Sequence, residues 1–155
     1  MQKQNQMIKT QDIQFLKRLG SCRKGLAFAR RFPSLADAWD ACEQADWMMC
    51  ALVQGNMLDK PTALKLAIAF AKRAPTRVGA PWLTRVAEAE SDSDAAGDAW
   101  AASDASAFSI AYCESIAFNH CLYATELRWQ AETIRQIVGN PFRRIDPHKK
   151  ERGRL

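Results

Sequence analysis

The chain has 155 residues and a net charge of +5, and 48% of its residues are hydrophobic and 25% charged. This balance excludes a disordered chain, and no apolar run approaches the roughly 20 residues that cross a bilayer, which excludes a membrane protein. The first residues, MQKQNQMIKTQD, contain no hydrophobic signal-peptide core. We therefore expect a cytoplasmic protein with one packed core.

Charge is divided along the chain into a basic, an acidic and a second basic segment. Residues 1–31 carry eight basic side chains against Asp12 alone. Between Arg85 and Arg128 there are eight acidic side chains and no basic one, and from Pro141 onward six basic residues outweigh two acidic ones. Such a division serves either complementary packing between helices or the steering of a charged partner toward one face.

All predicted elements are helices, because apolar residues recur at spacings of three and four and no stretch alternates as a strand does. Thr10 is expected to cap the first helix and Gly20 to end it. A second helix is expected over about 21–31, and Pro33 breaks the chain after it.

The next two predicted helices have clear start signals. Ser34 and Asp37 form a capping pair for SLADAWDACEQ, and Asp46 is expected to cap the helix that follows. Residues 47–53 are almost wholly apolar, which predicts a helix surrounded by others rather than one on the surface. Gly55 is its expected end.

Prolines mark the starts of two further helices. Asp59 or Lys60, followed by Pro61 in the first turn, is expected to start a helix whose inward face consists of Leu64, Ala67, Ile68 and Ala71. Pro81 is expected to begin the sixth helix, PWLTRVAEAE.

Residues 94–138 contain no proline and are rich in alanine, so they form either one long helix or two, and we favour a break near 103–106. A row of small residues at four-residue spacing would let another helix approach closely. Its members are Ala101, Ala105, Ser109, Cys113, Ala117, Cys121 and Thr125. Gly139 followed by Pro141 is a typical end for the last helix.

These elements predict an all-α fold. We expect a compact bundle of about six to eight helices, with a long alanine-rich C-terminal helix or helix pair. Residues 1–140 are assigned to a single helical domain and 141–155 to a basic C-terminal extension.

The sequence lacks the common motifs of catalysis and of cofactor binding. There is no GxxxxGK[ST], GxGxxG, GxSxG or HExxH pattern, and the five cysteines include no CxxC pair, so we expect reduced, buried thiols. His120 lies close to Cys113 and Cys121, but further zinc ligands are missing and the acid-flanked helix would raise the pKa of these thiols. We predict no enzyme, no metal and no cofactor.

Two other sets of residues have a structural and a functional interpretation. The acidic run from Glu88 to Asp98 lacks the glycine and closing glutamate of a calcium loop, which favours a solvated acidic turn. Large aromatic residues at helical spacing favour core packing, although a ligand cavity is the alternative. These residues are Trp39, Trp47, Trp82, Trp100 and Trp129.

Two stretches, SLADAWDACEQADWMMCAL and IRQIVGNPFR, resemble a widespread group of helical proteins from bacteria and their phages that are often labelled immunity proteins. In the first stretch the resemblance rests on Trp39, Cys42, Trp47 and Met48. It spans about residues 19–143, but Cys50 stands where an aromatic residue is expected and the basic tail replaces a longer continuation. The resemblance implies a role in conflict between bacteria, or between phage and host, by occluding a toxin or defence protein.

The sequence therefore predicts a protein-binding module without enzymatic activity, an immunity-type or counter-defence inhibitor. The residues predicted to contact the partner are Asp92, Asp94, Asp98, Asp104, Arg143 and Arg144. The alternative is an accessory protein that binds nucleic acid through its basic termini, although no known reading helix or aromatic platform accompanies them. A long alanine face also allows a homodimer.

Overall fold

The computed structural model describes residues 8–74, 76–112 and 120–145, and all regular elements in these ranges are helices. They are α1 (Thr10–Arg18), α2 (Arg23–Ala29), α3 (Leu35–Ala41), α4 (Ala45–Gln54), α5 (Lys60–Ala71), α6 (Thr76–Glu88), α7 (Asp92–Tyr112), α8 (His120–Val138) and the 3-10 helix η1 (Pro141–Ile145). The all-α prediction is confirmed, and the long C-terminal part is the helix pair α7 and α8.

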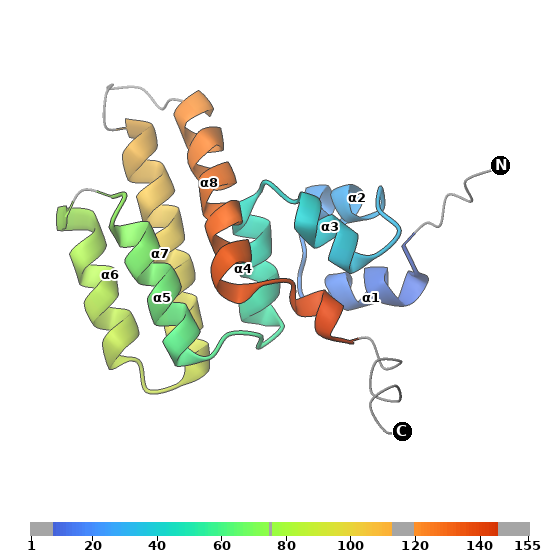
Figure 1. Cartoon of the computed structure of the whole chain (residues 1–155), viewed down its shortest axis with the longest axis horizontal. Helices are drawn as coiled ribbons and strands as arrows, with labels where there is room; N and C mark the ends of the chain where they lie inside the picture. Colours follow the sequence, from blue (N-terminus) through green and yellow to red (C-terminus); the bar gives the residue numbers. More distant parts are fainter. Residues whose placement is uncertain (1–7, 75, 113–119, 146–155) are drawn as a thin grey trace, which may run out of the picture.

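The helices form two regions that meet at α4 (Figure 1). The first region, which we call the bundle, consists of α4 to α8, with α7 packed against each of the other four helices. The second region, which we call the small region, consists of the short helices α1, α2 and α3 together with η1, which returns the chain from α8 to α3.

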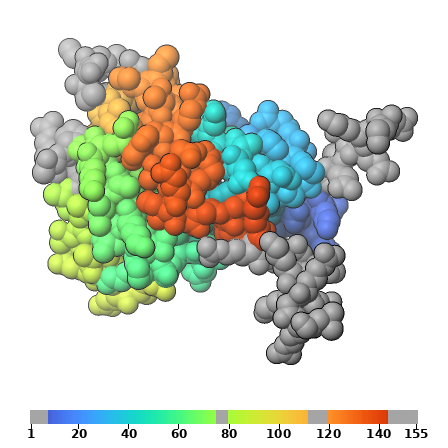
Figure 2. Space-filling model, in the orientation of Figure 1, coloured from blue at the N-terminus to red at the C-terminus, as the bar shows by residue number. Residues whose placement is uncertain are grey.

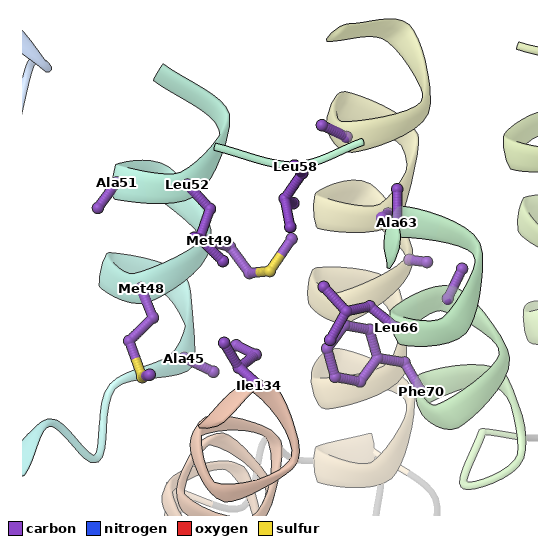
Figure 3. Packing of buried hydrophobic residues seen from close by; sticks show 14 of the residues in the cluster. Ala45, Met48, Met49, Ala51, Leu52, Leu58, Ala63, Leu66, Phe70 and Ile134 are labelled. Carbon is purple, nitrogen blue, oxygen red and sulfur yellow. The ribbon is translucent and has the colours of Figure 1, made fainter. Parts of the chain in front are cut away.

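Large apolar side chains close the core of the bundle. Leu66 and Phe70 of α5 and Met49 of α4 point toward the part of the core occupied by Ile134 of α8 (Figure 3). All four are fully buried, and each buried side chain of this size contributes about 1.5–3 kcal/mol to the stability of the fold. These contacts hold α4, α5 and α8 together.

Helix α4 is buried on two sides, as its apolar sequence predicts. Met49 points into the bundle, whereas Met48 and Ala51 point to the opposite side of the helix (Figure 3). Trp47, at the start of α4, lies against Phe28 of α2 with ring centroids 5.7 Å apart. Helix α4 is therefore the wall that the two regions share.

Small residues let α7 lie close to its neighbours. Those that are buried on α7 are Ala95, Ala96, Ala99, Ala102, Ser103, Ser106, Ala107 and Ala111. In the row predicted from the sequence, Ala101 and Ala105 are only half-buried, Cys121 and Thr125 are exposed, and the members within 113–119 lie outside the described residues. Alanine occurs on every side of α7, so spacing alone did not identify the buried side.

Several predicted helix ends are confirmed. The hydroxyl of Ser34 accepts a hydrogen bond from the backbone N–H of Asp37 at 3.1 Å, and Asp59 caps α5 through its carboxylate. Gly20 and Gly139 follow α1 and α8 with positive φ angles of 70° and 76°, a conformation that glycine adopts at no steric cost.

Two predicted caps are wrong. Lys9 occupies the cap position of α1 without a side-chain hydrogen bond, and Thr10 is the first residue of the helix. Gln44 occupies the cap position of α4, and Asp46 lies within the first turn. One oxygen of the Asp46 carboxylate, Oδ1, has no partner among the described residues, and it is considered below.

Two other predicted boundaries also differ. Helix α6 begins at Thr76, so Pro81 lies inside it, where the ring removes one backbone hydrogen bond; packing against α5 and α7 holds the helix together there. Helix α7 continues through residues 103–106, where a break was expected. The two serines of this stretch bond to Gln130 and to the carbonyl of Phe70, and so join α7 to its neighbours.

The inward side of α5 is rotated from the predicted one. Ala67 is buried as predicted, Leu64 and Ala71 are half-buried, and Ile68 is exposed. The other buried residues are Ala63, Leu66 and Phe70. Because α5 packs against α6, α7 and α8, its buried surface is wider than one stripe of the helix, and the sequence pattern alone did not locate its centre.

Candidate functional site

The two sequence stretches that carry the family resemblance lie against each other. The indole Nε1 of Trp39 donates a hydrogen bond to the carbonyl of Gly139 at 3.0 Å. The guanidinium of Arg135 donates to the carbonyl of Cys42 at 2.6 Å, just past the end of α3. Basic groups at a helix C-terminus satisfy carbonyls that have no partner within the helix. These contacts attach α3 to the end of α8.

Helix η1 extends this attachment. Asn140 donates to the carboxylate of Asp40 at 2.8 Å, and Arg143 forms an ion pair with the same carboxylate. Phe142 packs edge-on against Trp39 with ring centroids 5.6 Å apart. Phe142 and Arg143 of η1, which the sequence assigned to the basic extension, therefore contact α3.

The predicted contact residues Asp92 and Asp94 hold the start of α7. Asp92 Oδ1 accepts a hydrogen bond from the backbone N–H of Lys60 at 2.7 Å, and Asp94 Oδ2 accepts one from the Ser91 hydroxyl at 2.6 Å. Acids in a first helical turn also interact favourably with the helix dipole. Both acids are exposed, but each has a structural partner within the chain.

Asp98 and Asp104 lie further along α7. Asp98 pairs with Arg85 of α6 at 3.0 Å. Asp104 is half-buried, and this burial raises its pKa, with the negative charge of Asp46 adding to the effect. At about 100° per residue, Asp94 and Asp98 lie on one side of α7, whereas Asp92 and Asp104 lie on other sides, so the structure does not gather all four acids into one patch.

The two predicted arginines lie on η1, in the small region. Arg143 is paired with Asp40, and the side chain of Arg144 lies outside the described part of the chain. The remainder of the predicted extension, residues 146–155, also lies outside it. The fold therefore places these arginines and the four acids on separate elements.

The basic segment at the start of the chain forms a surface on the small region, which we call the basic surface. Figure 2 shows this part, in blue, at one end of the molecule. Its seven exposed residues are Lys9, Lys17, Arg18, Arg23, Lys24, Arg30 and Arg31. Within the described residues none of them forms an ion pair. Five arginines elsewhere do, so unpaired positive charge is concentrated on α1 and α2.

A cavity of about 230 Å³ lies between the small region and the second buried side of α4. We call it the aromatic cavity, because five aromatic side chains line it: Phe28, Trp39, Trp47, Trp100 and Phe142. Trp82 and Trp129 are not among its lining residues. Three of the five tryptophans thus border a cavity, the alternative to core packing that the sequence left open.

Two buried polar atoms of residues that line the aromatic cavity have no hydrogen-bond partner within the described part of the chain. They are Oδ1 of Asp46 and the indole Nε1 of Trp100. Leaving such an atom unpaired costs about 1–3 kcal/mol, and native proteins contain few of them. Burial also raises the pKa of Asp46. The sequence indicated an acid at the start of an apolar helix. Such an acid usually caps the helix, so its position beside the cavity was not predicted.

Two of the thiols that line the cavity, those of Cys42 and Cys50, are poor nucleophiles. Burial raises the pKa of Cys42 to about 11. Burial raises the pKa of Cys50 as well, with a contribution from Cys22, and both groups therefore remain protonated at neutral pH. The prediction of buried thiols is wrong for Cys22 and Cys121, which are exposed, and Cys113 lies outside the described residues.

Within residues 8–74, 76–112 and 120–145, no group of three or more histidine, cysteine or acidic side chains is placed to hold a metal ion. In the same ranges no helix combines the length and the apolar character that crossing a membrane requires.

Comparison of the chain with models of known protein families, with curated proteins and with solved structures finds no match. The resemblance to the bacterial and phage helical group therefore stays a prediction.

Proposed function

We propose that the protein binds another protein and blocks its action, in the manner of an immunity or counter-defence inhibitor. The basic surface supports this proposal best, because its seven exposed positive charges have no ion-pair partner among the described residues. A concentrated surface charge attracts a partner of opposite charge and accelerates association. The partner would therefore carry an acidic surface.

The acids Asp92, Asp94 and Asp98 remain predicted contact residues, but they are poor positions for a test. Two of them accept hydrogen bonds at the start of α7, and the third pairs with Arg85. Reversing their charge would therefore alter the fold as well as any interface. The basic surface forms no ion pair with the described residues, so the charges of its lysines can be removed at little structural cost. Arg31, which lies 4.8 Å from the centroid of the Phe28 ring, is left unchanged.

The test compares two double variants of exposed lysines. Lys17→Gln with Lys24→Gln removes two charges from the basic surface, and Lys65→Gln with Lys72→Gln removes two from α5. Tagged wild type first captures its partner from nuclease-treated host lysate, and the purified partner is then titrated against each protein by calorimetry. We expect a one-to-one complex that the first variant weakens by roughly fivefold and the second leaves unchanged.

Equal weakening by the two double variants would contradict the assignment of the interface to the basic surface. The second candidate function, nucleic-acid binding, is favoured by the same surface, because unpaired lysines and arginines also attract phosphates. It predicts that the partner is captured only when nuclease is omitted. It also predicts an affinity for DNA or RNA that falls steeply between roughly 50 and 200 mM salt, because several phosphates are neutralised on binding.

A further inference from the structure

The aromatic cavity is separate from the basic surface and has the features of a ligand site. Its walls come from both regions of the molecule, with Phe28 on α2, Trp39 on α3, Trp47 on α4 and Trp100 on α7. Pockets for small molecules are typically apolar and aromatic, with a few polar groups that orient the ligand. Here the polar atoms without a hydrogen-bond partner among the described residues are Oδ1 of Asp46 and the indole Nε1 of Trp100.

The volume of the cavity limits the ligand. An apolar cavity of about 150 Å³ in another protein accommodates benzene. The cavity here measures about 230 Å³, which is room for a molecule somewhat larger than one aromatic ring. Flat ring systems suit it best, because aromatic walls favour stacked and edge-on contacts with other rings.

The two unpaired atoms limit the polar group of the ligand. The indole Nε1–H of Trp100 can only donate a hydrogen bond, and the Asp46 carboxylate oxygen accepts one. A hydroxyl group can accept from the first and donate to the second. We propose that the aromatic cavity binds a small, flat apolar molecule that carries a hydroxyl group.

Two other ligand classes fit less well. An anion would lie beside Asp46, which is the only charged residue among the described residues that line the cavity, and it would meet no compensating positive charge. An ammonium group would suit Asp46 but offers no acceptor, so it would leave the N–H of Trp100 unpaired. The hydroxyl class is therefore preferred over both.

The first test locates the binding site. The full chain is prepared with 5-fluorotryptophan, its five 19F resonances are assigned by single Trp→Phe changes, and 2-naphthalenemethanol is added. We expect the resonances of Trp39, Trp47 and Trp100 to shift with saturation, while those of Trp82 and Trp129, outside the cavity, stay in place. No shift up to the solubility of the probe, or equal shifts at all five positions, would overturn the proposal.

The second test identifies the polar group through a matched set of probes on the same ring system. These are 2-naphthalenemethanol, 2-methylnaphthalene, 2-naphthylmethylamine and 2-naphthoate. We expect the alcohol to bind about tenfold or more tightly than the hydrocarbon, because the hydrocarbon leaves two buried polar atoms unpaired. Tightest binding of the amine or of the naphthoate, or equal binding of alcohol and hydrocarbon, would refute the assignment of a hydroxyl ligand.

A pair of variants connects the effect to Trp100. Trp100→Phe removes the N–H donor and keeps an aromatic ring. It should therefore lower the affinity for the alcohol by about fivefold and leave the affinity for the hydrocarbon nearly unchanged. Trp82→Phe is the matched control and should change neither affinity. The remaining 19F resonances show whether each variant is folded. An unchanged affinity of folded Trp100→Phe for the alcohol would show that Trp100 does not contact the hydroxyl.

Discussion

The bundle and the small region are stabilised in different ways. In the bundle, large side chains fill the core and the buried polar groups of α7 and α8 bond to one another: Gln130 binds both the hydroxyl and the carbonyl of Ser103, and Glu126 receives hydrogen bonds from Arg73 and Gln130. The small region is joined to the end of α8 by hydrogen bonds and to α4 by apolar contacts such as that of Phe28 with Trp47, and it leaves a cavity and unpaired charges. Sites that bind other molecules often accept such local instability.

This difference assigns separate tasks to the two regions. The bundle provides α4 as a fixed wall, and among the described residues its buried polar side-chain atoms are paired apart from Oδ1 of Asp46 and the indole Nε1 of Trp100. The small region, placed against that wall, carries the basic surface and completes the aromatic cavity. If the comparison is correct, changes in the bundle should mainly affect global stability, and changes at the junction should act locally.

The largest effect is expected from truncating the core of the bundle. Phe70→Ala should lower the free energy of unfolding by about 3–5 kcal/mol, because it removes a fully buried ring and leaves a void. Phe142→Ala, which removes a half-buried ring from the small region, should cost only about 1–2 kcal/mol. Urea unfolding followed by circular dichroism measures both free energies. Equal losses would show that the small region contributes as much to global stability as the core of the bundle.

The next largest effect concerns the buried polar network. Glu126 is 1% exposed and its partner Arg73 41%, so Glu126→Ala should cost about 2–3 kcal/mol, less than a fully buried ion pair would. Glu43→Ala removes an acid from an exposed pair with Arg128 and should change stability by less than about 0.5 kcal/mol. Chemical unfolding of the two variants side by side tests this, and a Glu126→Ala protein as stable as Glu43→Ala would show that the network does not stabilise the bundle.

A smaller and local effect is expected where the two regions meet. Arg135→Ala removes the donor to the carbonyl of Cys42 and should cost about 1–2 kcal/mol. Hydrogen exchange followed by mass spectrometry should then accelerate in peptides from α1 to α3, with little change in α5 and α7. Glu132→Ala, which removes the exposed carboxylate that pairs with Arg135, is the control. Uniform acceleration along the whole chain would mean that the regions open together.

The sequence predicted features that depend on neighbouring residues. The Ser34–Asp37 pair, the cap at Asp59 and the glycine after α8 are local, and each appears in the structure. The burial of α4 on two sides was also predictable, because one side of a helix cannot hide so many consecutive apolar residues.

Features that depend on distant residues were not predictable in the same way. The contact between Trp39 and Gly139 joins residues 100 positions apart, and the aromatic cavity exists because such contacts place the small region beside α4. The buried sides of α5 and α7 were misplaced, since alanine fits every side of a helix. Asp46 was assigned to a cap because an acid before an apolar helix usually caps it. Only the assembled structure places this residue among those that line the cavity.

The smallest predicted effect tests the buried carboxylate of Asp46 through its pH dependence. Burial raises the pKa of Asp46 above its ordinary value of 3.8, so the folded state holds its proton more tightly than the unfolded state. Ionisation therefore destabilises the fold, beginning near pH 3.8 and reaching its full extent above the folded pKa. Asp46→Asn removes this penalty and should raise Tm at pH 7 by about 2 °C, with the difference disappearing below pH 3.8.

Asp59→Asn provides a control of opposite sign. The hydrogen bonds from Thr62 lower the pKa of the exposed Asp59 carboxylate, so its charge stabilises the fold above pH 3.8 and this contribution disappears as the pH falls through the folded pKa. Thermal unfolding of the two variants between pH 3 and 7 should therefore give differences from wild type with opposite signs. If Asp46→Asn were instead less stable than wild type at pH 7, the backbone hydrogen bonds from Trp47 and Asp46 would outweigh the burial of the charge, and the pKa of Asp46 would lie below 3.8.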